Sequence, residues 1–274
     1  MTHQPSSSLV CACAGWTLPG QINEELAGQF PSLPQLQSEL NDLKNQEPAL
    51  SHLQRYAQFL QGVEINSSFY RPHLPATYAR WRLSVPDEFR FSVKLPKTMT
   101  HVLRLKNCED ELQKFIAEVS HLEEKLGCLL IQLPPSLSFE YAVVQQFFSL
   151  LRQFTDAPLA LEPRHPTWFQ STAFDLLLQN EICLVAADPG IAGYTVLQDD
   201  FPVTAPTVYL RLHGSPHMYY SSYDQVFLNN LSRRIAALSK PGSHIWCVFD
   251  NTAEGAAFPN AVTLQRQQRL ITKR

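Results

Sequence analysis

Glycine is scarce in this sequence, and long apolar runs do not occur. Only 10 of the 274 residues are glycine, and neither a Gly-rich phosphate loop nor a dinucleotide fingerprint is present. No stretch reaches the ~18 consecutive apolar residues that a membrane span requires. The first residues, "MTHQPSSSLV", lack the basic and apolar regions of a signal peptide. We therefore expect a cytoplasmic protein that does not bind membranes, and the sequence carries no motif for an organic cofactor.

Cysteine pairs at metal-ligand spacing are also lacking. The six cysteines are scattered, and most lie in apolar runs such as "CLLIQL", which is typical of small buried hydrophobes. Cys11 and Cys13 form a C-x-C pair inside a predicted strand, without a second Cys or His pair at zinc spacing, so we expect core residues there. A net charge of -3 and a pI near 6.3 give no overall attraction to nucleic acid, and a nucleic-acid partner is not favoured.

What the sequence does contain is one unit that recurs: a short strand-like run, turn residues, and then a helical pattern. A chain of this length with 45% hydrophobic residues can bury a full core as one domain. Eight such alternations predict an α/β fold, a TIM-like (β/α)8 parallel barrel, more than an open sheet. The strand-like runs are "LVCACAGW", "GVEINSSFY", "FRFSVKLP", "CLLIQLPP", "LALEPRHP", "ICLVAADP", "TVYLRLHG" and "HIWCVFDN".

The predicted boundaries follow from these runs. Residues 1–8 are expected to be a disordered tail and residues 9–274 the single barrel domain. Residues 17–48 form an unusually long first βα-loop, with a short helix of its own around residues 35–43. The weakest unit is the sixth, because "GIAGYTVLQDDF" is a poor helix.

The strands alternate apolar and polar residues, although both faces of a parallel barrel strand are covered. In the second strand Val63 and Ile65 share one phase, whereas Glu64 and Asn66 share the other. The apolar phase fits the helix-facing side, so the polar phase points into the barrel. Its polar members crowd toward the carboxyl ends of six strands, which is where a barrel keeps its active site.

Eight blocks of the sequence resemble the YecE-like family, the domain of unknown function 72. They run in the family's order over nearly the whole chain: "GW", "VEINSSFYR", "FRFSVKLPKTMTH", "LLIQLPPS", "EPRHPTWF", "VAADP", "YLRLHG" and "NTAEG". The resemblance implies a TIM-barrel fold, in agreement with the strand count. It also implies which residues form the site, but it does not indicate which reaction the site catalyses. The positions that match the family pattern are Glu64, Asn66, Phe69, Tyr70, Lys94, His101, Gln132, Glu162, Arg164, His165, Trp168, Asp188, Arg211, Gly214, Asn251, Glu254 and Gly255.

Three blocks depart from that pattern. The usual Thr-Ser-Gly-Trp reads Cys13-Ala14-Gly15-Trp16 here, which removes two hydroxyls from the predicted mouth. An Asn-Asn-Asp run is replaced by residues 250–252, "DNT", and an aromatic residue is replaced by Pro163.

Two carboxylates that face each other across the barrel could act as the general acid and the general base of a reaction. Glu64 and Glu162 come from the second and fifth strands, which lie across the lumen, and a nearby cation would keep one of them ionised. Lys94 and Asp188 complete the candidate catalytic set. The alternative is a structural network, in which Glu162 pairs with Arg164 and Glu64 with Lys94 only to compensate charge.

Cations and aromatic residues gather at the same strand ends, although the protein is slightly acidic overall. Arginine forks match phosphate or carboxylate, so we expect a small anionic ligand, phosphorylated or sugar-like. The candidate substrate-binding residues are Asn66, Tyr70, His101, Gln132, Arg164, His165, Trp168, Arg211, His213 and Asn251.

A divalent metal is a further possibility, with Glu64, Glu162, Asp188, His213 and Asp250 as potential ligands. Because Lys94, Arg164 and Arg211 interleave with them and would repel a dication, a metal is not favoured.

Three functions therefore stay open. The favoured one is an acid/base enzyme, a hydrolase, lyase or isomerase. The second is a metal-dependent phosphodiesterase or nuclease, and the third is a non-catalytic binder of an anionic metabolite or a protein partner. The sequence leaves the oligomeric state open.

Overall fold

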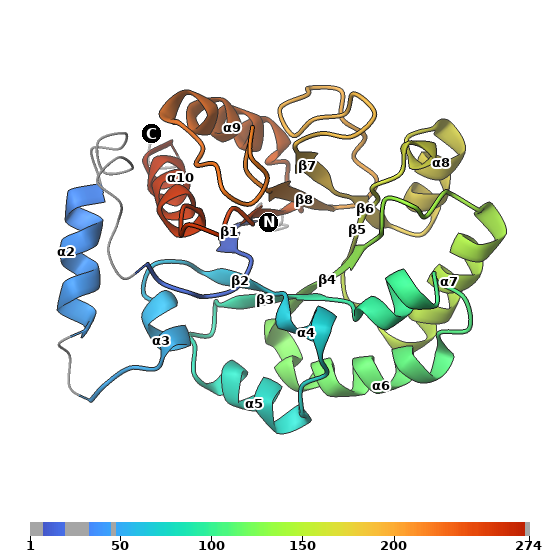
Figure 1. Ribbon diagram of the computed structural model, residues 1–274, viewed down its shortest axis with the longest axis horizontal. Helices are drawn as coiled ribbons and strands as arrows, with labels where there is room; N and C mark the ends of the chain where they lie inside the picture. Colours follow the sequence, from blue (N-terminus) through green and yellow to red (C-terminus); the bar gives the residue numbers. More distant parts are fainter. Residues whose placement is uncertain (1–7, 20–32, 45–47, 272–274) are drawn as a thin grey trace, which may run out of the picture.

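Two parallel β-sheets with helices packed around them form the centre of the protein (Figure 1). The computed structural model describes residues 8–19, 33–44 and 48–271. One sheet has the order β1-β9-β8-β7 and the other β2-β3-β4-β5-β6. The strands are β1 (Ser8–Cys13), β2 (Gly62–Ile65), β3 (Arg90–Lys94), β4 (Leu126–Gln132), β5 (Leu159–Glu162), β6 (Ile182–Leu184), β7 (Ala186–Asp188), β8 (Thr207–Leu212) and β9 (His244–Phe249). The predicted α/β class with parallel strands is thereby confirmed.

Each of the eight predicted strand runs contains a strand of the structure. The sixth run is divided at Val185 into β6 and β7, which belong to different sheets. Strand β1 begins at Ser8, so the last residue of the predicted tail is already paired, with His244 of β9. Residues 1–7 lie outside the described residues.

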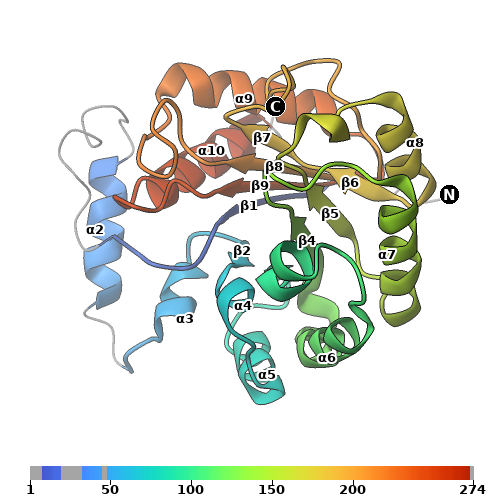
Figure 2. The same ribbon diagram turned by 45° about the vertical axis from the view of Figure 1, so that its right-hand side comes forward.

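The helices lie outside the strands in both views (Figures 1 and 2). They are α2 (Leu33–Lys44), α3 (His52–Tyr56), α4 (Ser67–Tyr70), α5 (Pro75–Leu83), α6 (Glu109–Val119), α7 (Tyr141–Phe154), α8 (Ser171–Gln179), α9 (Gln225–Leu238) and α10 (Ala257–Ile271). A π-helical turn (Thr98–Val102) and two 3-10 helices (Ser120–Lys125 and Pro166–Trp168) complete the set. The helix expected around residues 35–43 is confirmed by α2, which lies at the edge of the molecule.

The sixth unit differs from the others because its connection is not helical. Within the described chain, residues 189–206 between β7 and β8 contain turns and no helix. The poor helical pattern of "GIAGYTVLQDDF" predicted this outcome, since its apolar residues have no single face.

The two phases of the strands lie in two separate apolar clusters. Val63, Ile65 and Leu210 belong to the large cluster between the sheets and the helices, whereas Ala12 and Tyr209 belong to a smaller one. Complete burial of a Val or Ile side chain contributes about 1.5–3 kcal/mol, so the outward phase fixes the register of each strand. The polar residues of the inward phase are therefore held at defined heights.

Backbone contacts also connect the two sheets. Ala14 forms a parallel bridge with Glu64, and the Gly15 N–H donates to the Glu64 carbonyl at 2.9 Å. Gly15 has φ +98°, a conformation that favours glycine, and this turn brings β1 to β2. At the other end of the five-stranded sheet the Val185 N–H donates to the Leu161 carbonyl of β5 at 2.9 Å, so the β5–β6 pairing continues to the residue that precedes β7.

Candidate functional site

Arg211 is the centre of a buried ion-pair network at the carboxyl ends of the strands. Its Nε and Nη2 donate to the two carboxylate oxygens of Glu64 at 3.0 and 2.7 Å, a bidentate pair. Its Nη1 donates to Glu162 Oε2 at 3.0 Å, and its Nη2 also lies 3.0 Å from Asp250 Oδ2. Arg211 is only 1% exposed, so all three nitrogens of its head group are committed to carboxylates.

Glu162 carries the network to a second arginine and a histidine. Its Oε1 lies 2.7 Å from Arg164 Nη2 and 2.7 Å from His213 Nε2. The other ring nitrogen of His213, Nδ1, lies 3.0 Å from Asp250 Oδ2. We call Glu64, Glu162, Arg164, Arg211, His213 and Asp250 the polar layer.

The charges of the polar layer stabilise each other. Burial alone would raise the pKa of Glu162, but Arg211, His213 and Arg164 hold it well below its usual value. Burial alone would lower the pKa of Arg211, and Asp250, Glu64 and Glu162 hold it well above its usual value. Burial is therefore outweighed at both groups, and the charged forms of Glu162 and Arg211 are favoured inside the protein.

Tyr209 and Ser92 lie against Glu64. The Tyr209 hydroxyl donates to Glu64 Oε2 at 2.8 Å and lies 2.9 Å from Ser92 Oγ. Tyr209 also stacks on Trp246, with ring centroids 6.0 Å apart, and both belong to the smaller apolar cluster. Glu64 consequently has every oxygen in contact with a donor and is fully buried.

Lys94, at the end of β3, differs from the two arginines in its contacts. Among the described residues it forms no ion pair with a carboxylate, and its Nζ lies 4.2 Å from the centre of the Phe69 ring. Burial lowers its pKa to about 8, with a further lowering by Arg211, while Glu64, Glu162 and Asp250 act in the opposite direction. Lys94 thus exchanges a proton closer to neutral pH than an ordinary lysine.

The short helix α4 places Phe69 at Lys94. The Ser68 hydroxyl donates to the carbonyls of Ile65 and Lys94, at 3.0 and 2.7 Å, and ties α4 to the ends of β2 and β3. His101, in the π-helical turn, lies edge-on to Phe69 with ring centroids 5.0 Å apart. Burial lowers the pKa of His101, and Lys94 and Lys97 lower it further.

Two predicted site residues are instead bound by groups outside the polar layer. Asp188 Oδ2 accepts from the Tyr223 hydroxyl at 2.8 Å. Asn251 is fully buried and donates to the Ser221 carbonyl and to Asn260 Oδ1, both at 2.9 Å. These contacts hold the loop after β8 and the start of α10.

Other predicted residues have local roles. Trp168 is fully buried and its indole donates to the Leu137 carbonyl at 2.9 Å, so it packs in the core. His165 Nδ1 accepts from the Thr167 N–H and caps the short 3-10 helix. Tyr70 is 72% exposed and lies against Phe69. Gln132, which pairs with Glu162 in the β4–β5 register, is half-buried.

Sequence reasoning left three residues out of its catalytic and binding sets that the structure brings to the layer. Tyr209 shares the strand phase of Arg211, and that phase alone could have indicated its contact with Glu64. Asp250 directly follows β9 and had been considered only as a metal ligand. Tyr219 lies in the loop after β8, with its ring centroid 5.8 Å from that of His213. Its place after a strand end had made it one of several aromatic residues that could stack on a ligand, and the pattern could not distinguish it from the others.

Several polar atoms at the strand ends lack a partner among the described residues. They are buried, and native structures contain few such groups, so each one needs an explanation. The atoms in question are Asn66 Oδ1, Arg164 Nε and Asn251 Oδ1.

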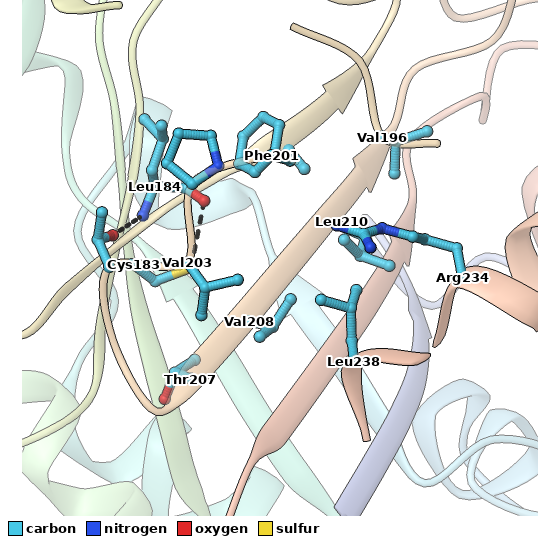
Figure 3. A pocket seen from close by; sticks show the side chains of 13 residues that line it. Cys183, Leu184, Val196, Phe201, Val203, Thr207, Val208, Leu210, Arg234 and Leu238 are labelled. Carbon is cyan, nitrogen blue, oxygen red and sulfur yellow. Dashed lines mark hydrogen bonds between the residues drawn. The ribbon is translucent and has the colours of Figure 1, made fainter. Parts of the chain in front are cut away.

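A small cavity lies on the other face of β8 (Figure 3). Val208 and Leu210 of β8 and Leu238 and Arg234 of α9 contribute to its lining, and its volume is about 10 Å³. That is room for about one water molecule, too little for an organic ligand.

The fold and the candidate site define the class of protein. It is an α/β protein with parallel sheets surrounded by helices, and its candidate site is a layer of buried ion pairs at the carboxyl ends of the strands. The family described as "Protein of unknown function DUF72" matches residues 38–273, and the chain belongs to this family.

The relatives carry no established activity in their names. The chain is 32% identical to UPF0759 protein YecE of Escherichia coli K12 over 122 residues, which span 44% of this chain and 44% of YecE. It is 23% identical to UPF0759 protein YunF of Bacillus subtilis strain 168 over 234 residues, 76% of this chain and 83% of YunF.

Solved structures of the same family share the fold. A DUF72 family protein of Enterococcus faecalis V583 matches with a TM-score of 0.73 and 19% identity, over 96% of both chains. A DUF72 family protein of Thermotoga maritima MSB8 matches with a TM-score of 0.70 and 21% identity, over 97% of this chain and 100% of that one.

The described residues lack a membrane-spanning helix and a metal-binding cluster. None of their helices is both long enough and apolar enough to span a bilayer. They also contain no group of three or more His, Cys, Asp and Glu side chains arranged to hold a metal ion.

Proposed function

We propose that the two sheets form one closed (β/α)8 barrel, and that its carboxyl-end mouth binds a small anionic ligand and acts on it by acid/base chemistry. Two junctions support closure: the Ala14–Glu64 bridge between β1 and β2, and the single residue Val185 between β6 and β7. In such a barrel the residues that follow the strands converge at one mouth.

The functional proposal rests on a difference between the buried cations: among the described residues, Arg211 pairs with carboxylates, and Lys94 does not. Glu64, Glu162 and Asp250 all bind Arg211, whereas Lys94 is left over an aromatic ring, 8% exposed. Burying an ammonium group without a carboxylate costs free energy unless another negative group pairs with it. An anionic ligand is the partner that fits this position.

Arg164 supplies the second contact in this proposal. Only its Nη2 has a partner in the polar layer, its Nε has none among the described residues, and its side chain is 12% exposed. The free edge of a guanidinium suits phosphate or carboxylate. Asn66 Oδ1, also without a described partner, would accept a hydroxyl of the ligand.

The remaining charges of the polar layer then form the floor of the site. Because Arg211 has its three nitrogens bound to carboxylates, its role is to hold Glu64, Glu162 and Asp250 in place rather than to bind the ligand. Lys94 is the group we assign to proton transfer, since a pKa of about 8 lets it both gain and lose a proton near neutral pH.

One observation favours a second candidate, a non-catalytic binder. Glu64 and Glu162 are both fully buried and both bound to arginine, which removes them from the general acid and base roles that their strand positions suggested. Binding without chemistry would need only Lys94 and Arg164.

The metal-dependent phosphodiesterase alternative receives less support. Arg164 and Arg211 occupy the carboxylate oxygens that a dication would need, and their charge would repel it. Hydrolysis of a nucleotide substrate that EDTA abolishes would favour this alternative over the other two.

Ligand-linked stabilisation tests the proposal. The melting temperature should rise with inorganic phosphate in the wild-type protein, because a ligand at about 100 times its Kd stabilises the folded state by about 2.7 kcal/mol. Lys94→Met and Arg164→Met should each remove this rise, and the control Lys97→Met, at an exposed neighbouring position, should retain it. An equal rise in all four proteins would contradict binding at this mouth.

A further inference from the structure

Tyr219 covers one side of the polar layer from the loop between β8 and α9. Its ring meets that of His213 edge-on, at 89° and with centroids 5.8 Å apart. The side chain is nevertheless 40% exposed. One part of the ring therefore lies on the polar layer, and the rest is open to solvent.

The backbone of Tyr219 adopts a conformation that a bulky residue rarely takes. Its φ is +71°, in the left-handed region, where an aromatic side chain is strained. Two backbone hydrogen bonds hold it: its N–H donates to the His213 carbonyl, and its carbonyl accepts from Ala253 N–H at 3.1 Å. Strain that the surroundings maintain in this way is a feature of binding and catalytic sites.

The Tyr219 hydroxyl lies within electrostatic reach of the polar layer. Burial raises its pKa, and Asp250 raises it further, while Arg164 and Arg211 lower it and Glu162 raises it. Arg164, with its unpartnered Nε, is the ligand-binding cation proposed above. Arg164 Nη2 lies 2.8 Å from His213 Nε2, and Tyr219 contacts the ring of this histidine, so Tyr219 lies one side chain away from Arg164.

We propose that Tyr219 is a specificity-determining residue that packs its ring against the cyclic part of the ligand, so that the mouth prefers ring-bearing phosphate monoesters to inorganic phosphate. This inference rests on the proposed function and deepens it, because Lys94 and Arg164 hold the charged end. A tyrosine offers a large, rigid face with only two side-chain torsions, which costs little entropy on binding.

The neighbouring tyrosine lacks the left-handed backbone and, among the described residues, the ring contact with His213, and it provides a matched control. Tyr220 is 56% exposed and is not among the residues with positive φ. Its loss should therefore leave ligand preference unchanged.

The experiment compares thermal shifts with three probes: inorganic phosphate, methyl phosphate and phenyl phosphate. In the wild-type protein phenyl phosphate should bind at least tenfold tighter than methyl phosphate, an advantage that one stacked ring supplies. Tyr219→Ala should bring phenyl phosphate to the level of methyl phosphate while inorganic phosphate binds as before. Tyr219→Phe and Tyr220→Ala should both keep the preference.

A stability comparison separates this role from a purely structural one. Tyr219→Gly removes the ring and also relieves the backbone, so it should melt at a higher temperature than Tyr219→Ala and show the same loss of ring preference. Equal affinity of the wild-type protein for methyl and phenyl phosphate would overturn the inference alone. No response to any of the three probes would overturn the proposed function together with it.

Discussion

Strand β8 has two faces, and an arginine lies at each of them: the buried Arg211 and the half-buried Arg234. On the inward face Arg211 and Tyr209 contact Glu64. On the outward face Val208 and Leu210 line the small apolar cavity beside Arg234 of α9 (Figure 3). Among the described residues Arg211 binds three carboxylates within 3.0 Å, whereas Arg234 has one ion pair, at 3.7 Å, with the fully exposed Asp199.

The difference shows what a buried charge requires. Arg211 is enclosed on all sides, so only carboxylates inside the protein can compensate it. The side chain of Arg234 is 9% exposed and its partner lies in solvent, which is how a long side chain buries its stem and keeps its head group near water. Its Nε has no described partner, but the lining around it is apolar. Arginine is therefore the centre of a buried ion-pair network on one face of β8, and it only borders a cavity on the other.

Removal of the two arginines should give the largest contrast. Arg211→Met leaves the carboxylates of Glu64, Glu162 and Asp250 buried without their shared cation, and should lower the free energy of unfolding by about 3–5 kcal/mol. Arg234→Met removes a long ion pair to an exposed partner and should cost less than about 1 kcal/mol. Urea denaturation at pH 7 measures both. Similar losses of unfolding free energy in the two variants would contradict the difference between the two arginines.

Much of this contrast could be predicted from the sequence, because it depends on strand periodicity. Alternation placed Val208 and Leu210 on one face and Tyr209 and Arg211 on the other, and the structure divides them between two regions in that way. The strand positions followed for the same reason: short apolar runs between turn residues have few alternatives. Only the break at Val185 between β6 and β7 departs from the predicted series.

The pairing of head groups could be predicted only in part. The expected pair of Glu162 with Arg164, two residues apart, is present at 2.7 Å, but pairing between distant strands depends on side-chain reach across the sheets. The local pattern indicated Lys94 as a possible partner of Glu64. In the structure Glu64 instead pairs with Arg211, 147 residues away. The sequence pattern also could not distinguish Trp168, which is fully buried, from an aromatic residue exposed at the strand ends. Loop residues such as Tyr219 are placed by turns and distant hydrogen bonds, for which periodicity carries no signal.

Lys94 offers a smaller effect with a defined pH dependence. Its pKa is about 8 in the folded protein and 10.5 in the unfolded chain, so the buried ammonium opposes folding below pH 8. Between those values the unfolded chain binds more protons, and the stability of the wild-type protein gains a contribution that rises with pH. Lys94→Met should therefore be more stable than the wild type at pH 7, by about 2–3 kcal/mol.

The advantage should decline from pH 8 upward and disappear above about pH 10.5, where lysine is neutral in both states. Denaturation curves at pH 7 and at the highest pH that the fold tolerates would test this. Lys97→Met, at the exposed position three residues further on, should show no such trend. A destabilised Lys94→Met protein at pH 7 would mean that the Phe69 contact outweighs burial.

The smallest expected effect comes from Asp199, the one ion-pair partner of Arg234 among the described residues. Its carboxylate is fully exposed and 3.7 Å from the guanidinium, so water screens the interaction and the side chain gives up rotamer freedom to maintain it. Asp199→Asn should change the free energy of unfolding by less than about 0.5 kcal/mol. A loss of about 3 kcal/mol, as for a buried pair, would show that Arg234 depends on its carboxylate as Arg211 does, and that the two faces of β8 obey the same rule.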